Sequence, residues 1–149
     1  MEKKDLKPAG VFKYFEEICQ VPRPSKKEEK MIAYLKTFGA KHNLETKVDE
    51  AGNVLIKKPA TPGKENLQTV VLQSHIDMVC EKNNDVQHDF LTDPIETEID
   101  GEWLKAKGTT LGADNGIGVA TELAILADDS IEHGPLECLF TVDEETGLT

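Results

Sequence analysis

The stretch Thr69–Met78, TVVLQSHIDM, decides the fold class of this 149-residue chain. Its first four residues, 69–72, are predominantly apolar without alternation, which predicts a strand buried on both faces. The strand leads directly into His75 and Asp77, which are two residues apart and so project from the same face of an extended segment. Open α/β sheets place their sites where strands end in this way.

Helical and strand patterns alternate on both sides of this stretch. Before it, we expect helices over residues 11–20 and from a capping box at 25–28 to residues 42–43, then strands at 44–48 and 54–56 around a Gly52–Asn53 turn. After it come a turn-rich segment at 79–103, a helix at 115–127 and a last strand at 136–142. This order predicts an α/β fold, a mixed sheet flanked by helices with at least some parallel pairing.

Composition narrows the class of protein. The chain is 38% hydrophobic and 30% charged, which predicts a globular domain, and its formal net charge of -11 disfavours nucleic acid and anionic membrane surfaces as partners. No signal peptide or membrane-spanning run is visible. The three scattered cysteines, Cys19, Cys80 and Cys138, indicate reduced thiols packed as small hydrophobes and a cytoplasmic location.

The last strand ends in an unusual acidic turn, TVDEETG, at residues 141–147. Its three consecutive carboxylates repel one another, which raises a pKa unless a cation lies among them. No Lys or Arg follows Gly108. Either the acids point into water, or a cation from outside the chain neutralises them.

A glycine-rich loop, residues 108–118, surrounds a single Asp114 just before the predicted helix. Glycines permit close approach of a ligand, but Asp114 is equally compatible with an ordinary helix N-cap. The loop lacks the Lys-Ser/Thr ending of a phosphate-binding P-loop, and a central aspartate would repel phosphate.

Taken alone, each cluster has an ordinary structural explanation: a strand-end histidine beside an unrelated aspartate, an N-cap, a solvated acidic turn. Together they offer imidazole and carboxylate ligands at element ends that can converge on one crevice. Such ligands suit Zn²⁺, Mn²⁺ or Co²⁺ in a hydrolytic site, so we expect one or two divalent metals to supply the missing positive charge.

Four sequence blocks carry a resemblance to a known family. LQSHIDMVCEKN, HDFLTDPI, DGEWLKAKGTTLGADNGIG and HGPLECLFTVDEETGLT occur in order and together resemble the aminoacyl-histidine (Xaa-His, or cytosol non-specific) dipeptidases, also called peptidase D, of the M20 metallopeptidase clan. The resemblance implies a partial di-zinc peptidase catalytic domain of the phosphorylase/hydrolase-like type. It also implies hydrolysis of dipeptides, Xaa-His or with broad specificity, by a metal-activated water.

The resemblance also implies a role for each motif residue. His75 would bind one metal and Asp77 would be its supporting carboxylate. Asp114 would bridge the two metals, with a cis peptide bond after it. Glu144 would be the general base and Glu145 a ligand of the other metal. The motif gives His88 no metal role, and we expect it, His133 and Trp103 to be packing or turn residues.

Family members are about three times longer. The resemblance therefore implies that residues 1–149 are the N-terminal part of the catalytic domain, and that a second (lid or dimerisation) domain, a later acidic ligand and a C-terminal histidine lie elsewhere. The full-length protein would be a homodimer. Two alternatives stay open: another M20 activity, such as tripeptide cleavage or deacylation, or an inactive metal-binding fragment.

Overall fold

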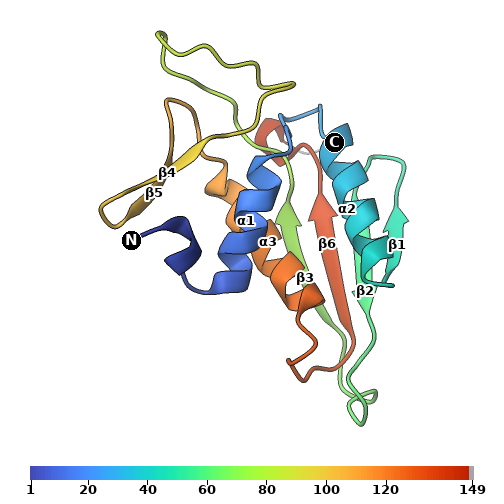
Figure 1. Ribbon diagram of the computed structural model, residues 1–149. Helices are drawn as coiled ribbons and strands as arrows, with labels where there is room; N and C mark the ends of the chain where they lie inside the picture. Colours follow the sequence, from blue (N-terminus) through green and yellow to red (C-terminus); the bar gives the residue numbers. More distant parts are fainter. Residues whose placement is uncertain (148–149) are drawn as a thin grey trace.

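The computed structural model of the chain describes residues 1–147, so the last two residues of the fourth quoted block lie outside the described residues (Figure 1). The helices are α1 (Ala9–Cys19), α2 (Glu29–Lys41) and α3 (Ala113–Ala127), with single 3₁₀ turns η1 (Lys3–Asp5) and η2 (Glu144–Thr146). The strands are β1 (Glu45–Val48), β2 (Val54–Lys58), β3 (Val70–His75), β4 (Thr97–Asp100), β5 (Trp103–Ala106) and β6 (Leu136–Thr141).

Four strands form one mixed sheet in the order β1-β2-β6-β3, as the sequence predicted. β3 and β6 are parallel, whereas β1–β2 and β2–β6 are antiparallel. In the parallel pair His75 lies opposite Thr141, the last residue of β6. The residues that follow the two strands therefore lie at the same end of the sheet, where the carboxyl ends of β3 and β6 meet.

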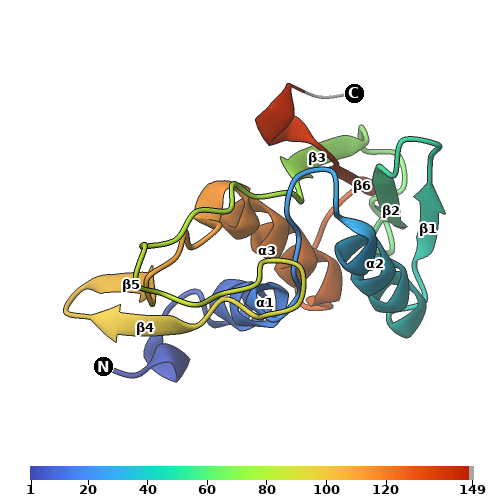
Figure 2. The ribbon, with the colours of Figure 1, turned by 90° about the horizontal axis from the view of Figure 1, so that it is seen from above.

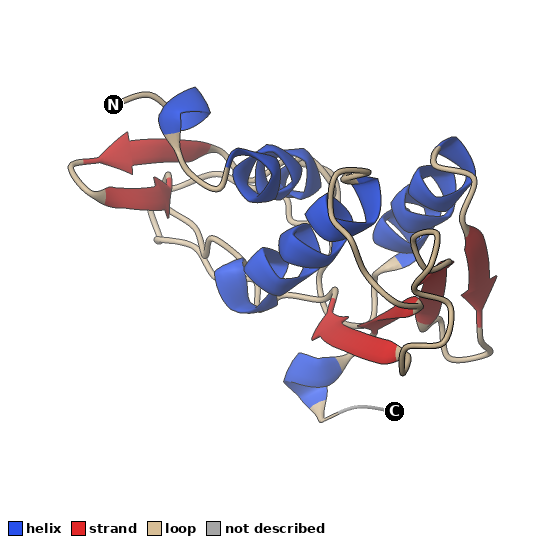
Figure 3. Cartoon of the chain, turned by 90° about the horizontal axis from the view of Figure 1, so that it is seen from below, coloured by secondary structure: helices blue, strands red, loops and turns tan. Residues whose placement is uncertain are grey.

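All three α-helices lie on one face of this sheet (Figures 2 and 3). Alternate residues of the central strands point into that layer, because side chains alternate across a strand. Val54 and Ile56 of β2 and Cys138 and Phe140 of β6 are all fully buried. Burying a side chain of the size of Phe140 stabilises the fold by about 1.5–3 kcal/mol, so this interface fixes the sheet against the helices.

The expectation that the strand at residues 69–72 is buried on both faces is wrong. β3 lies at the edge of the sheet, and Val70 and Val71 are 51% and 57% exposed. Burial increases along the strand until Ser74 and His75 are buried, where α3 packs against β3. The buried end of this strand is the end that carries the candidate site.

The predicted capping box at residues 25–28 is also wrong. α2 begins at Glu29 after an N-cap, Glu28, that makes no side-chain capping bond. Ser25 and Glu28 instead bond to groups beyond the helix, at Asp77 and Asp143. The local pattern predicted that both side chains accept backbone N–H groups of the helix, whereas Ser25 donates to Asp77 and Glu28 accepts the N–H of Asp143.

The turn-rich segment after β3 contains a hairpin that the sequence analysis missed. β4 and β5 pair around Gly101 and extend beyond α1, away from the four-stranded sheet (Figure 2). Trp103 flanks this turn and is 76% exposed, so it is not a packing residue within residues 1–147. All three cysteines are free, two of them buried and Cys80 partly exposed.

Over residues 1–147, no helix combines the length and apolar character that crossing a membrane requires.

Candidate metal centre

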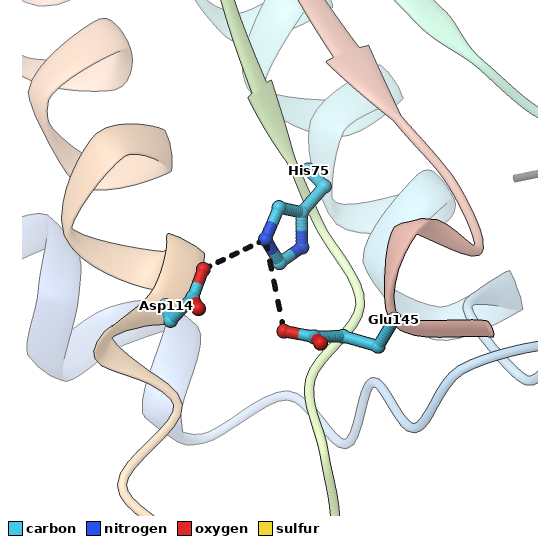
Figure 4. A group of neighbouring side chains, drawn as sticks. All are labelled: His75, Asp114 and Glu145. Carbon is cyan, nitrogen blue, oxygen red and sulfur yellow. Dashed lines mark hydrogen bonds and ion pairs between the residues drawn. The ribbon is translucent and has the colours of Figure 1, made fainter. Parts of the chain in front are cut away.

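Three side chains predicted to bind metal meet at the edge where β3 and β6 end (Figure 4). His75 is the last residue of β3, Asp114 lies in the first turn of α3, and Glu145 lies in η2 after β6. One ligand atom from each lies within 4.8 Å of the others. His75 Nε2 is 2.9 Å from Asp114 Oδ1 and 3.9 Å from Glu145 Oε1.

These separations are close to those of a coordinated metal. Bonds of about 2.0–2.1 Å in a tetrahedron place neighbouring ligand atoms roughly 3.3 Å apart. The two distances from His75 Nε2, 2.9 and 3.9 Å, bracket that separation, and the two carboxylate oxygens lie within 4.8 Å of each other. An imidazole nitrogen with carboxylate oxygens is a donor set that suits zinc and its substitutes.

Neighbouring groups fix the tautomer of His75. Its Nδ1 lies 3.0 Å from the backbone oxygen of Asp77 and 3.2 Å from Asp77 Oδ1. Both of these oxygens accept hydrogen bonds, so Nδ1 carries a hydrogen. In the neutral ring the lone pair therefore lies on Nε2, which faces Asp114 and Glu145.

Asp77 is completely buried and joins the histidine to the acidic turn. Its carboxylate accepts bonds from Ser25 Oγ at 2.6 Å, Glu144 N at 3.0 Å and Glu145 N at 3.1 Å. Burial opposes ionisation, but these donors and His75 outweigh it, and the pKa of Asp77 is lowered below its usual value. Asp77 is therefore a carboxylate that orders the site rather than one that faces it.

Side chains from the segments just before α2 and β2 hold the backbone that precedes Glu144. Asp143 is buried in a left-handed conformation (φ 58°), and its N–H donates to Glu28 Oε2 at 2.7 Å. The N–H of Val142 donates to Asn53 Oδ1 at 3.0 Å. Sequence analysis missed the roles of Ser25 and Glu28 because both also fit a helix-capping pattern.

Asp114 is presented to the site by the glycine-rich loop. Gly112 has φ +80°, and Asp114 itself has non-helical angles within the first turn of α3. Its side chain is 85% exposed and makes no capping bond, whereas Asn115 Oδ1 accepts the N–H of Gly118 at 3.1 Å. The N-cap alternative is therefore wrong for Asp114. The Asp114–Asn115 peptide bond is cis, as expected.

The charged groups of the site shift one another's pKa values, and the crowding of acids raises the pKa of a carboxylate, as the sequence analysis anticipated. Burial lowers the pKa of His75, but the bond to Asp114 and the nearby carboxylates outweigh it, and the net pKa is raised. Burial and the charges of Asp114 and Glu144 raise the pKa of Glu145. A carboxylate that resists ionisation beside other acidic groups, as Glu145 does, is a favourable setting for a divalent cation.

Glu144 and Glu145 approach the same ring nitrogen. Glu144 Oε2 lies 3.6 Å from His75 Nε2, but its side chain is 46% exposed compared with 21% for Glu145. Glu144 thus reaches both the site and the solvent.

Two other histidines predicted to be structural lie in packing or turn positions. The ring of His88 packs on Phe90 with centroids 4.5 Å apart, and His133 Nδ1 lies 2.7 Å from the Gly134 carbonyl oxygen. Neither is among the residues that converge on the metal centre.

Comparison with known proteins by family model and by sequence points to one peptidase family. Residues 71–148, slightly more than half of the chain, match the model of peptidase family M20/M25/M40. The chain is 52% identical over 147 residues to cytosol non-specific dipeptidase from Escherichia coli, covering 99% of this chain and 30% of that protein.

The solved structures that the chain resembles include peptidases as well. The crystal structure of aminoacylhistidine dipeptidase from Vibrio alginolyticus matches with a TM-score of 0.96 and 55% identity over all of this chain and 30% of that one. An aminopeptidase from Bacillus cereus matches with a TM-score of 0.76 and 25% identity over 93% of this chain and 37% of that one. The chain thus spans about a third of the length of these relatives. On its sequence, its fold and the family model it matches, the chain belongs to peptidase family M20/M25/M40.

Proposed function

We propose that this chain carries the metal-binding half of a site that hydrolyses dipeptides. The observation that carries the proposal is the convergence of His75 Nε2, Asp114 Oδ1 and Glu145 Oε1 within 4.8 Å, with the Glu144 carboxylate beside them. A relative at 52% identity is named a cytosol non-specific dipeptidase, and a solved relative an aminoacylhistidine dipeptidase, which supports dipeptides as the substrate class and the cytoplasm as the location.

In this proposal His75, Asp114 and Glu145 hold zinc, with Mn²⁺ or Co²⁺ as substitutes. A bound divalent cation would polarise the scissile carbonyl and lower the pKa of water. Asp77 keeps the hydrogen of His75 on Nδ1, so that Nε2 stays available as a ligand. Asp114 would be shared if two ions are bound.

Glu144 supplies the proton transfer. Its carboxylate lies 3.6 Å from His75 Nε2 and is 46% exposed, so it borders the ligands while remaining open to water and substrate. From there it can accept a proton from the attacking water and deliver it to the leaving amine, a contribution of about 10²–10⁴-fold in rate. Asp77 fixes the position of Glu144 by accepting its backbone N–H.

Three ligands are few for a two-metal site. Because the chain spans about 30% of the length of its dipeptidase relatives, we propose that an acidic ligand, a histidine and the residues that bind the substrate come from the remainder of a longer, homodimeric protein. On this account the 149-residue chain alone hydrolyses no dipeptide.

The test compares two neighbouring variants in the full-length protein that contains this chain. Glu144→Gln should abolish dipeptide turnover and leave bound zinc unchanged, because glutamine keeps the size of glutamate but cannot take the proton. Glu145→Gln should instead reduce bound zinc. Zinc content and turnover are measured on both variants.

The division of roles is wrong if Glu144→Gln stays active, or if it loses as much zinc as Glu145→Gln. A wild-type protein that cleaves tripeptides or acylated substrates in preference to dipeptides would support the alternative M20 activity. Zinc binding without any hydrolysis would support a non-catalytic role.

A further inference from the structure

Arg23 is the only arginine of the chain, and it is 2% exposed. It lies in the short segment between α1 and α2, outside the motifs that contain the proposed metal ligands. A buried cation needs hydrogen-bond partners that offset the free-energy cost of removing it from water.

The partners of Arg23 lie in the two segments that carry His75 and Asp114. Its Nη1 donates to the carbonyl oxygen of Ile76 at 2.8 Å, and its Nη2 donates to that of Gly112 at 2.7 Å. Ile76 is the residue between His75 and Asp77, and Gly112 precedes Asp114 by two positions. One rigid guanidinium group therefore joins the end of β3 to the start of α3.

The glycine-rich loop is shaped around this group. A Cβ atom at Gly112 or at Gly116 would lie 2.6 Å from Arg23 Nη2, closer than non-bonded atoms can approach. The main chain of Arg23 is also tied to β3, because its carbonyl oxygen accepts the N–H of Met78 at 3.0 Å. Both ends of the residue thus hold the backbone around Asp77.

A role in stability alone does not account for these contacts. A buried charge is by itself weak evidence of a stabilising role, because removing it from water costs free energy that its partners must offset. What an arginine adds is the fixed geometry of its fork, which can direct bonds at two acceptors at once. Here the two acceptors belong to segments that are 36 positions apart in the sequence and that must meet for His75 Nε2 and Asp114 Oδ1 to lie 2.9 Å apart.

We propose that Arg23 is a positioning residue of the metal centre: by joining the Ile76 and Gly112 carbonyls, it fixes the separation of His75 and Asp114. This inference rests on the proposed function, because it assigns Arg23 a role toward the metal that those ligands hold.

The test uses Arg23→Met and Arg23→Lys in the full-length protein that contains this chain. Methionine removes both the charge and the two bonds, whereas lysine keeps the charge but lacks the rigid fork. If the bonds matter, both variants should bind Zn²⁺ about tenfold or more weakly, the range seen when groups that orient ligands are lost. If only the charge matters, Arg23→Met should bind zinc more tightly, because a repelling cation is gone, and Arg23→Lys should bind normally.

The matched control is Leu35→Ala, which opens a cavity in the buried face of α2 without touching the proposed ligands. Zinc affinity is measured by competition with a chelator at a temperature where circular dichroism shows every variant folded. The visible absorption of the Co²⁺-loaded proteins gives a second readout, since it reports the coordination geometry itself. Arg23→Lys, which retains the buried charge, decides the matter if Arg23→Met does not fold.

Weaker zinc binding and a changed cobalt spectrum in the Arg23 variants, with Leu35→Ala unchanged, are the expected results. Zinc affinity and cobalt spectra equal to those of the wild type would overturn the positioning role while leaving the proposed function intact. A wild-type protein that binds no divalent cation would overturn the proposed function itself, and the role of Arg23 with it.

Discussion

Replacing Asp77 by asparagine should damage both stability and metal binding, because its carboxylate accepts bonds through both oxygens. Oδ1 accepts from Glu144 N at 3.0 Å and lies 3.2 Å from His75 Nδ1, while Oδ2 accepts from Ser25 Oγ at 2.6 Å and Glu145 N at 3.1 Å. Asparagine has one acceptor oxygen and one NH₂ group. In either orientation, the NH₂ group faces a backbone N–H, at Glu144 or at Glu145.

The size of the effect follows from these contacts. A backbone donor left without an acceptor costs about 1–3 kcal/mol, and each surviving bond loses roughly 1 kcal/mol because its acceptor is no longer charged. Since Asp77 is fully buried, water cannot replace the lost partners. We therefore expect Asp77→Asn to lower the free energy of unfolding by about 3–5 kcal/mol. Zinc affinity should fall about 10–100-fold, because His75 loses the group that orients it.

The assay is urea unfolding followed by circular dichroism in the presence of a chelator, so that stability is measured separately from zinc affinity. Asp49→Asn is the matched control. Asp49 accepts three bonds, from Gly52 N, Asn53 N and Asn53 Nδ2, but it lies on an exposed turn where water can replace them. If Asp77→Asn loses no more stability than Asp49→Asn and binds zinc as the wild type does, the ordering role of Asp77 is wrong.

Two further predictions concern the groups behind the site. Gly112→Ala should lower the free energy of unfolding in urea and the zinc affinity more than Gly101→Ala does. Both glycines have positive φ (+80° and +61°), but only at Gly112 would a Cβ meet Arg23. Equal losses of stability and zinc affinity in the two variants would contradict the close fit of Gly112 against Arg23. Burial raises the pKa of Glu122, which accepts a bond from Ser74, to about 7. Between about pH 4.5 and 7, Glu122 is therefore protonated in the folded protein but ionised in the unfolded chain. Relative to Glu122→Gln in chelator, the wild type should therefore lose up to about 3 kcal/mol of unfolding free energy between pH 4.5 and 7, whereas a constant difference would refute the raised pKa.

Sequence patterns predicted the site correctly where it depends on local residue spacing and on the position of a strand end. The two-residue spacing of His75 and Asp77 and the apolar run before the acidic turn predicted that groups from two strands would meet. This held because β3 and β6 are parallel and end at the same edge of the sheet. The cis bond after Asp114 followed from the family resemblance and not from any pattern.

The sequence was insufficient where distant partners decide. An apolar run does not reveal its place in a sheet, and β3 lies at the edge with Val70 and Val71 exposed. Ser25 and Glu28 satisfy a local capping pattern, but buried partners at Asp77 and Asp143 bind them instead. Arg23 carried no signal at all, since its acceptors are main-chain oxygens, which no residue type reveals.

Anomalous diffraction at the zinc absorption edge, from crystals of the full-length protein grown with zinc, tests the central claim most directly. Our account predicts an anomalous peak about 2.0–2.2 Å from His75 Nε2 and from carboxylate oxygens of Asp114 or Glu145, with the Glu144 carboxylate beyond bonding distance. A zinc peak elsewhere on the chain, or no peak between these side chains, would contradict the assignment of this site as the metal centre.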